Sequence, residues 1–340
     1  MNSYHTYTEI KSQPQAWQNA LDVTSTLAAN IQELTDRYDR VIFSGCGSTY
    51  YLSLAGAALY QQLTGKPARA VPGSELLFNS STVLEKDAPT LLVAISRSGT
   101  TSETLRAVEH FKRSQKGEVI AISNYDTDLA ALADLSILLP AGQEESVAQT
   151  RSFASMYVAV TALSAAAARR NDLSGAISAL PEVGQRLMAK YEDLAKALGE
   201  DLSRDRFYFL GSGSRYGLAC EGNLKMKEMT LTHSEPFHFL EFRHGPMSMV
   251  GKTAVVVGLV SEQNFEREQA VVDEMQALGA RGFTLGESHG DVIFQSGIPE
   301  EARGVLYLPV LQLMAFYRSL AKGLNPDSPK NLTAVVTLNL

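Results

Sequence analysis

Cysteine and tryptophan are scarce in this sequence, and it carries no excess of positive charge. Its 340 residues include two cysteines and one tryptophan, and 37 acidic against 30 basic residues give a net charge of −7. Cys46 and Cys220 make no disulfide framework and lack a metal-ligand spacing. The acidic balance argues against a broad basic face for nucleic acid and against a polybasic membrane contact. A site for an anion must therefore be local.

Long apolar runs and a leader sequence are missing as well. No uninterrupted run of about 18 apolar residues is present, and the start MNSYHTYTEIKSQPQ lacks the basic and apolar regions of a signal peptide. We therefore expect a cytoplasmic protein without a membrane contact. The histidines lack ligand spacing and the carboxylates do not cluster with them, so no metal site is expected. The 45% apolar content is ordinary for globular proteins, and the length allows two domains.

The chain contains an internal repeat. The stretch FSGCGSTYYLSLAG, which begins at Phe43, returns as FLGSGSRYGLACEG from Phe209, with seven identical residues. Each copy belongs to an apolar run, a glycine-rich turn and a helix-like stretch, which together predict a strand, a turn and a helix. Such a unit presents backbone N–H groups and a helix N-terminus to an anion. The sequence therefore predicts two similar halves.

Apolar runs alternate with segments of helical period along the rest of the chain. This alternation predicts an α/β fold of two doubly wound domains, each with a parallel sheet flanked by helices. We expect N-terminal helices over 1–35, a first domain with a helical linker over 36–195, and a second domain over 196–340. The expected strands are 41–43, 91–95, 118–122, 136–139, 207–210, 253–260 and 305–309, and the expected helices are 101–115, 151–169, 176–199, 213–231, 264–278 and 309–323.

The residues ISRSGTT, at 95–101, directly follow the apolar run LLVA. Hydroxyl groups, an arginine and a glycine at the end of a strand and the start of a helix fit a phosphate cradle. Arg97 can add a bidentate contact or a salt bridge at the rim. The alternative is helix capping by Thr100 or Thr101, but capping needs one hydroxyl group and this turn has several. We therefore expect an anion site in this turn.

A second polar cluster lies on the helix that follows the second glycine turn. If this helix starts near Arg215, then Glu221, Lys225 and Glu228 share one of its faces. Such a face is either a solvated set of salt bridges or part of a site. The segment that continues the helix is aromatic and rich in histidine and proline, which a solvated surface does not require, so it favours a site.

One histidine in this region stands at a turn. Gly245 and Pro246 predict a bend directly after His244, which fixes the position of the imidazole. An imidazole can take and return a proton near neutral pH. We expect His233 and His238 to be ordinary core or surface residues.

The motifs ISRSGTTSET, SGCGST and GSGSRYGLACEGNLKMKE…FRHGP resemble the paired sugar-isomerase (SIS) domains of the isomerase half of glucosamine-6-phosphate synthase and of the related SIS-type deaminases. The similarity extends from about residue 30 to the tail SPKNLTAVVTL. It implies a flavodoxin-like fold in each half and a sugar-phosphate site without a metal or organic cofactor. Arg97 departs from the glutamine of the synthase, so another anionic sugar substituent stays open. The residues that the resemblance assigns to the phosphate are Ser48, Thr49, Ser96, Arg97, Ser98 and Thr101.

The resemblance also assigns the groups around the sugar. The segment SVAQTRS resembles the stretch that lines the sugar, which implies that Val147 and Gln149 lie beside the substrate. Glu228 matches the carboxylate that moves a proton between C1 and C2 of the open-chain sugar, and Lys225 can balance its charge or contact the sugar. His244 matches the histidine that opens the ring. In the synthase this histidine reaches the active site of the neighbouring subunit, so the resemblance implies a homodimer.

Two departures from the synthase bear on the reaction. The sequence enters the first sugar-binding half without a glutaminase domain, and Ala334 aligns with the lysine that forms a Schiff base in the synthase. We therefore expect deamination of glucosamine 6-phosphate to fructose 6-phosphate and ammonium. The alternatives are an aldose–ketose isomerase or a deglycase for another phosphorylated or anionic sugar, and a sugar-phosphate sensor without chemistry. Both candidate catalytic residues are present and no DNA-binding segment stands out, which disfavours the sensor.

Overall fold

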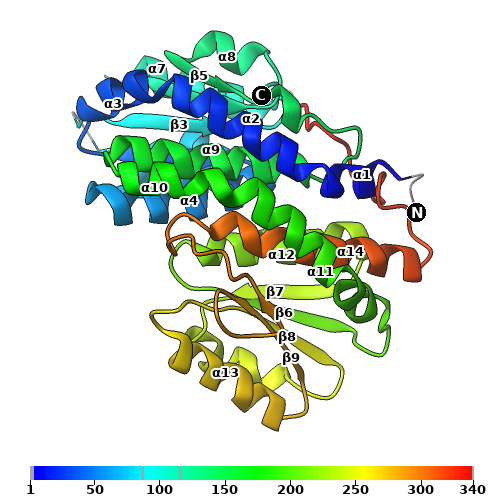
Figure 1. The fold of residues 1–340 in the computed structure, drawn as a ribbon. Coiled ribbons are helices and arrows are strands. Elements are labelled where there is room, and N and C mark those ends of the chain that lie inside the picture. The colour runs from blue at the N-terminus through cyan, green and yellow to red at the C-terminus, as the bar shows by residue number, and fades with distance from the viewer. Residues whose placement is uncertain (1–3, 86–87, 115–116, 339–340) are drawn as a thin grey trace. The chain divides into compact units, whose positions relative to one another are not determined.

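The computed structural model describes residues 4–85, 88–114 and 117–338 (Figure 1). Its chain divides into two compact units, each made of several segments. The N-terminal unit comprises Ser12–Glu144, Arg151–Ser178 and Thr333–Leu340, and the C-terminal unit comprises Met1–Lys11, Glu145–Thr150 and Ala179–Leu332. Neither unit is one continuous segment, and whether 36–195 and 196–340 form independent domains stays a prediction.

A parallel five-stranded sheet forms the centre of the N-terminal unit. Its order is β2-β1-β3-β4-β5, which is the flavodoxin-like order. Strands β1, β3 and β4 are buried at every residue, which explains why their sequences are almost continuously apolar. The strands are β1 Val41–Gly45, β2 Ala68–Pro72, β3 Leu91–Ile95, β4 Val119–Ser123 and β5 Leu135–Leu138.

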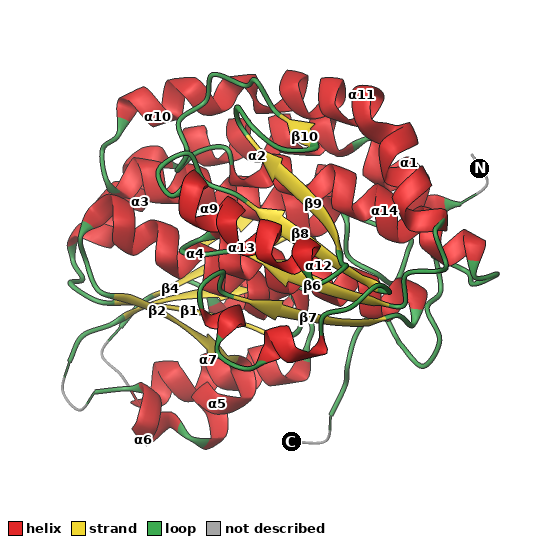
Figure 2. Cartoon of the chain, turned by 90° about the horizontal axis from the view of Figure 1, so that it is seen from below, coloured by secondary structure: helices red, strands yellow, loops and turns green. Residues whose placement is uncertain are grey.

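Helices cover both faces of this sheet. The helices α2, α3 and α4 pack with the buried α9, whereas α5 to α8 contribute to a core with Ile42, Leu92 and Val119 from the other face. Figure 2 shows α5, α6 and α7 gathered on one side of the strands. The helices of this unit are α2 Gln13–Thr26, α3 Ala28–Asp36, α4 Ser48–Thr64, α5 Gly73–Phe78, α6 Ser80–Val83, α7 Ser102–Ser114, α8 Asp128–Leu132, η1 Pro140–Gly142, α9 Arg151–Ala167 and α10 Asn171–Ala176.

The C-terminal unit repeats the same topology. Its parallel strands follow the order β10-β9-β8-β6-β7, which is the order of the first sheet read from the opposite edge. Its strands are β6 Arg206–Leu210, β7 His233–Phe237, β8 Ala254–Leu259, β9 Arg281–Gly286 and β10 Val292–Ile293. Its helices are α1 His5–Lys11, η2 Ile177–Ala179 at the boundary of the unit, α11 Leu180–Glu200, α12 Arg215–Thr230, η3 Glu241–Arg243, η4 Pro246–Met249, α13 Phe265–Ala277, η5 Gly304–Tyr307 and α14 Leu308–Ala321.

The sequence repeat corresponds to one packing contact that occurs in both units. A Cβ added to Gly56 of α4 would lie 3.4 Å from the ring of Phe43 in β1, and one added to Gly222 of α12 would lie 3.1 Å from the ring of Phe209 in β6. In each half the helix glycine therefore faces the phenylalanine of the preceding strand. The contact is tight at Gly222, whereas at Gly56 the close neighbour of the added Cβ is Val160 of α9, at 2.8 Å. The predicted fold class, with two α/β halves, is confirmed.

The expected strand at 305–309 is wrong. These residues form η5 and the start of α14, and Pro309 lies in the first turn of that helix, where its missing N–H costs nothing. Gly304–Ala321 is apolar enough in composition to cross a membrane, but 89% of it is buried inside the protein, so it is a core segment. A short apolar run does not distinguish a buried strand from a buried helix.

Several strands of the structure were not predicted from the sequence. The edge strands β2 and β7 contain the sequences ARAVP and HSEPF, in which proline and charged residues interrupt the apolar pattern. Edge strands tolerate such residues because one side of their backbone pairs with no neighbour. Strand β9 and the two-residue β10 were also not expected.

Candidate functional site

Two loops of the N-terminal unit meet at the carboxyl edge of its sheet. Strands β1 and β3 are neighbours, and Ser44 pairs with Ala94, so the turns that follow the two strands lie side by side. The chain leaves β1 toward β2 and β3 toward β4, in opposite directions across the sheet. Ligands of doubly wound sheets bind in the crevice at this switch point. Both halves of the expected anion cradle therefore lie where this fold binds ligands.

The first loop, 45–48, is closed by a side chain of α4. The Thr49 hydroxyl accepts a hydrogen bond from the backbone N–H of Cys46 at 2.9 Å and donates to its carbonyl at 3.0 Å. A Cβ on Gly45 would lie 2.6 Å from Thr49, and Gly47 has φ 59°, so both positions require glycine. Ser48 is buried at the first residue of α4. Thr49 thus shapes the loop, and Ser48 stands at the helix N-terminus.

The second loop, 96–101, carries a row of hydroxyl groups. Ser96 Oγ accepts a hydrogen bond from the Gly99 N–H at 3.1 Å and lies 3.4 Å from Thr101 Oγ1. Ser98 Oγ accepts hydrogen bonds from the backbone N–H and the hydroxyl of Thr100. The Thr101 carbonyl accepts the Leu105 N–H, which puts Thr101 at the N-terminus of α7. The structure therefore brings Ser96 and Thr101 together, in a loop that also caps a helix.

The buried Arg97 side chain has polar partners in two other segments of this unit. It is 7% exposed, its Nη2 donates to the carbonyl oxygen of Ala334 at 2.5 Å, and its Nη1 lies 3.9 Å from the buried carboxylate of Glu144. Glu144 also accepts a hydrogen bond from Ser152. Ala334 therefore offers a backbone carbonyl to Arg97. The Glu144 carboxylate also offsets part of the positive charge of Arg97.

The acidic and basic face of α12 is buried in the C-terminal unit. The side chains of Glu221 and Lys225 are 1% and 2% exposed, and that of Glu228 is 13% exposed. Lys225 Nζ lies 3.0 Å from Glu221 and also contacts Glu228. Burial by itself lowers the pKa of Lys225, but the two carboxylates outweigh it and hold this pKa above its ordinary value. The structure therefore brings the three residues together, and they are not a solvated surface.

His244 lies in an exposed turn of the same unit. Its backbone N–H donates to the Glu241 carbonyl at 2.9 Å, and the following Gly245 has φ 118°, a backbone conformation that glycine favours. Within the described residues no hydrogen bond or ion pair joins His244 to Glu228. His238 stacks on Tyr216 with ring centroids 4.0 Å apart, as befits a surface residue, and His233 is exposed.

The stretch expected to line the sugar, SVAQTRS at 146–152, divides between the units: 146–150 lie in the loop 145–150 of the C-terminal unit, and Arg151 and Ser152 begin α9 of the N-terminal unit. The Val147 N–H donates to the Asp327 carbonyl at 2.9 Å. Gln149 is partly exposed, but its Oε1 is buried and accepts no hydrogen bond from any residue that the structure describes. Buried polar atoms are normally paired, so this amide oxygen is available to a ligand group.

The loops at the equivalent switch point in the C-terminal unit carry ion pairs in place of a row of hydroxyl groups. The loop after β8 has the sequence SEQN instead of SRSGT. The buried Arg303 lies 2.9 Å from Glu262, and the buried Arg215 lies 3.0 Å from Glu268. These carboxylates offset the positive charge of the two arginines, which would otherwise attract an anionic ligand. The sequence analysis missed this network, because its members lie far apart along the chain.

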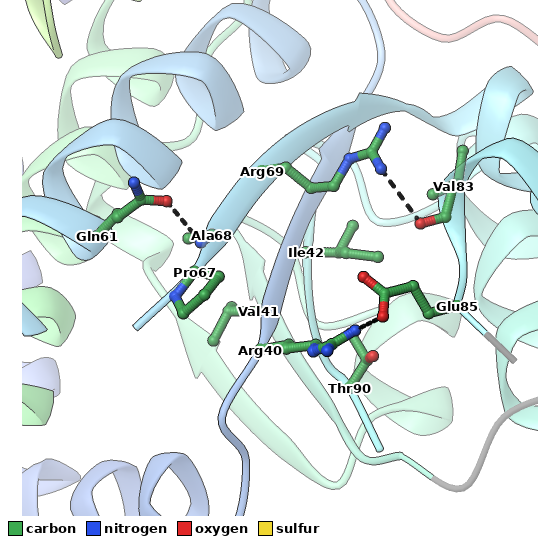
Figure 3. A pocket seen from close by; sticks show the side chains of 10 residues that line it. All are labelled: Arg40, Val41, Ile42, Gln61, Pro67, Ala68, Arg69, Val83, Glu85 and Thr90. Carbon is green, nitrogen blue, oxygen red and sulfur yellow. Dashed lines mark hydrogen bonds and ion pairs between the residues drawn. The ribbon is translucent and has the colours of Figure 1, made fainter. Parts of the chain in front are cut away.

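A separate cavity of about 240 Å³ lies at the opposite edge of the first sheet (Figure 3). The residues that line it include Arg40, Pro67 and Thr90, which directly precede β1, β2 and β3. Its polar groups bind one another, as Arg40 pairs with Glu85 and Arg69 donates to the Val83 carbonyl at 3.4 Å. Because ligands of this fold bind at the carboxyl ends of the strands, this cavity is not the candidate site.

The repeated topology and the single hydroxyl cradle agree with the sequence comparisons. The model of the SIS domain family matches residues 33–166 and 202–314. The chain belongs to the SIS domain family. This family includes sugar-phosphate isomerases, and its two matched segments contain the central strands of the two sheets.

Several proteins of named activity are similar to nearly the whole of this chain. The chain is 32% identical to a glutamine–fructose-6-phosphate aminotransferase (isomerizing) of Pyrococcus horikoshii over 97% of its own length, but it spans only 57% of that protein. It is similar to the structure of a glucosamine-6-phosphate deaminase from Thermotoga maritima, with 27% identity, a TM-score of 0.81 and coverage of 98% and 100% of the two chains. A tagatose-6-phosphate ketose/aldose isomerase from Escherichia coli gives 25% identity, a TM-score of 0.87 and coverage of 97% and 96%.

Proposed function

We propose that this SIS protein is an aminosugar-phosphate deaminase/isomerase that converts glucosamine 6-phosphate and water to fructose 6-phosphate and ammonium. The observation that carries the proposal is the buried group of Glu221, Lys225 and Glu228, in which one carboxylate keeps a solvent-facing edge. A buried ammonium group compensates the negative charge of a neighbouring carboxylate, and a carboxylate in a fixed position can act as a general base. We place the reaction without a metal or organic cofactor, as the resemblance implies.

The phosphate is assigned to the cradle of the N-terminal unit. Ser48 at the end of the first loop and the hydroxyl groups of Ser96, Ser98 and Thr101 supply donors together with the N-termini of α4 and α7. Thr49 takes part by holding the first loop in shape. Arg97 adds the positive charge, and its contact with the Ala334 carbonyl fixes its guanidinium group at the loop. Val147 and Gln149 line the sugar, and the unpaired Gln149 Oε1 accepts a hydrogen bond from a hydroxyl group.

The reaction proceeds through the open-chain sugar. His244 moves the proton that opens the ring and exposes the C1 aldehyde. Glu228 removes the C2 proton, which is acidic beside this carbonyl group, and returns a proton to C1, while the carbonyl oxygen gains a proton and the amino nitrogen gives one up. The resulting imine at C2 adds water, and the C–N bond breaks to leave the C2 ketone and ammonium. Lys225 stabilises the Glu228 carboxylate before it accepts the proton.

The exposed position of His244 supports a homodimer in which it serves the neighbouring subunit. Large apolar side chains lie near it along the chain, since Leu240 is 52% exposed and Met249 is 57% exposed. A second copy of the chain would cover these side chains and exclude water from the imidazole.

A second candidate is a ketose/aldose isomerase for another sugar phosphate. The similarity to the tagatose-6-phosphate isomerase, with a TM-score of 0.87, supports it. The same base and ring-opening histidine would move a proton between C1 and C2 with no loss of nitrogen. A deglycase would use the same residues on an amino-acid adduct of a sugar phosphate. A sensor would bind the sugar phosphate and leave it unchanged.

The test is an assay of ammonium and fructose 6-phosphate release from glucosamine 6-phosphate. We expect Glu228→Gln and His244→Ala each to lower kcat by about 100-fold or more, as for the loss of a general acid or base. Glu266→Gln and His233→Ala alter exposed residues of the same unit and should retain wild-type rates. If ammonium does not appear but tagatose 6-phosphate or another ketose phosphate is isomerised, the isomerase replaces the deaminase. If no sugar phosphate is converted, the enzyme proposal fails.

A further inference from the structure

The N-terminal helix holds the loop that carries Val147 and Gln149. Glu9 of α1 is 3% exposed, and its Oε1 accepts hydrogen bonds from the backbone N–H groups of Glu145 at 2.6 Å and Ser146 at 3.2 Å. Its Oε2 accepts a hydrogen bond from the Ser146 hydroxyl group. One buried carboxylate therefore satisfies three donors of the loop. Hydrogen bonds to a charged acceptor are stronger than those between neutral groups.

Asp327 completes the attachment from the other side. Its carboxylate accepts hydrogen bonds from the backbone N–H groups of His5 and Thr6 and from the Thr6 hydroxyl group, all within 3.0 Å. Its carbonyl oxygen accepts the Val147 N–H at 2.9 Å. The start of α1 and the chain after α14 therefore run side by side (Figure 1), and both contact the loop. The result is a closed ring of contacts among three segments that are distant in sequence.

The far end of the loop is fixed as well. The Gln312 side chain in α14 donates to the Thr150 carbonyl at 3.2 Å, and Gln312 is 1% exposed. The backbone is thus held at residues 145 to 147 and again at 150. Gln149, whose Oε1 has no hydrogen-bond donor among the described residues, lies between the two fixed points.

We propose that Glu9 is a positioning residue, which holds the loop 145–150 in the conformation that presents Val147 and Gln149 to the sugar. The inference rests on the proposed function, because it needs a sugar at this loop. Glu9 acts through the loop and does not touch the reacting atoms. Loss of its carboxylate removes the acceptor of these two backbone N–H bonds and one of the two acceptors near the Ser146 hydroxyl group, and the loop can then leave the conformation that binds the sugar.

The test compares three variants of the full chain. Glu9→Ala removes all three acceptor contacts, and we expect it to raise KM by about 10- to 100-fold with a smaller change in kcat. Glu9→Gln keeps one oxygen for the two N–H groups. Its NH₂ can donate to Ser146 Oγ once the Ser146 hydrogen turns to the Ala148 carbonyl, which lies 3.1 Å away. This variant should restore most of the affinity. Tyr7→Phe removes the bond from α1 to Glu192 without touching the loop, and should leave KM unchanged.

Hydrogen exchange of the backbone N–H groups of 145–150 provides a readout that does not depend on activity. Faster exchange in Glu9→Ala, with wild-type exchange in Tyr7→Phe, together with the raised KM, supports the inference. Unchanged exchange in Glu9→Ala overturns it, as does faster exchange with unchanged KM. If wild-type protein converts no sugar phosphate, the proposed function fails and the exchange alone decides whether Glu9 holds the loop. If Glu9→Ala does not fold, Ser146→Ala removes one contact from the loop side and must still raise KM.

Discussion

Lys225 offers the sharpest test of the buried charges on α12. Replacement by Met keeps a similar length and apolar stem but leaves Glu221 and Glu228 without their shared cation. Removal of one partner of a buried ion pair typically costs about 3–5 kcal/mol, because a buried charge is left uncompensated. We therefore expect Lys225→Met to lower the free energy of unfolding by about this amount at pH 8.

The pH dependence follows from the direction of the pKa shift. The pKa of Lys225 is raised in the folded protein, so its contribution to stability is complete below its unfolded pKa of about 10.4 and is lost only as pH rises through the folded value. In Lys225→Met the two carboxylates repel each other, which favours retention of a proton by one of them. The destabilisation should therefore be smaller at pH 5 than at pH 8.

The assay is urea unfolding of wild type and variants at both pH values. Lys227→Met is the matched control, because Lys227 is exposed on the same helix, and its effect should stay within about 0.5 kcal/mol. Adding Glu221→Gln to Lys225→Met removes one of the two opposed charges and should recover part of the loss. A destabilisation below about 1 kcal/mol, or an equal one at pH 5 and pH 8, would refute the reasoning.

Two further predictions concern the cradle and the thiols. Gly99 has φ 65°, and a Cβ there would lie 2.2 Å from Thr127 Oγ1, so Gly99→Ala should cost at least about 1–3 kcal/mol in urea unfolding and weaken inorganic phosphate binding by calorimetry. Gly175→Ala, in open space on α10, should be neutral or stabilising, and an equal loss in both variants would contradict the strain argument. Burial raises the pKa of the Cys46 thiol, and that of Cys220 to about 12. Since the thiolate is the reactive form, folded protein at pH 8 should react with dithionitrobenzoate at least about tenfold more slowly than urea-unfolded protein, and equal rates would disprove it.

The central strands and the hydroxyl-rich loop after β3 could be predicted from the sequence because their signals are local. Strands β1, β3, β4, β6 and β8 are buried on both faces and therefore read as apolar runs. The hydroxyl groups of 95–101 predict a turn, because such a row of polar side chains is unfavourable in a hydrophobic core. The run 305–309 was misjudged because a helix buried on all sides has the same apolar sequence as a buried strand.

The sequence by itself determined that the chain is a duplicated α/β protein with a hydroxyl-rich loop in its first half, and anion binding by this loop stays a prediction. It could do so because strand, glycine turn and helix follow one another without interruption, so short-range patterns encode them. Only the tertiary structure decided that the Glu221–Lys225–Glu228 face is buried, and that α1 contributes Glu9 to the loop 145–150. Burial and contacts between segments more than a hundred residues apart depend on packing, which no local pattern records.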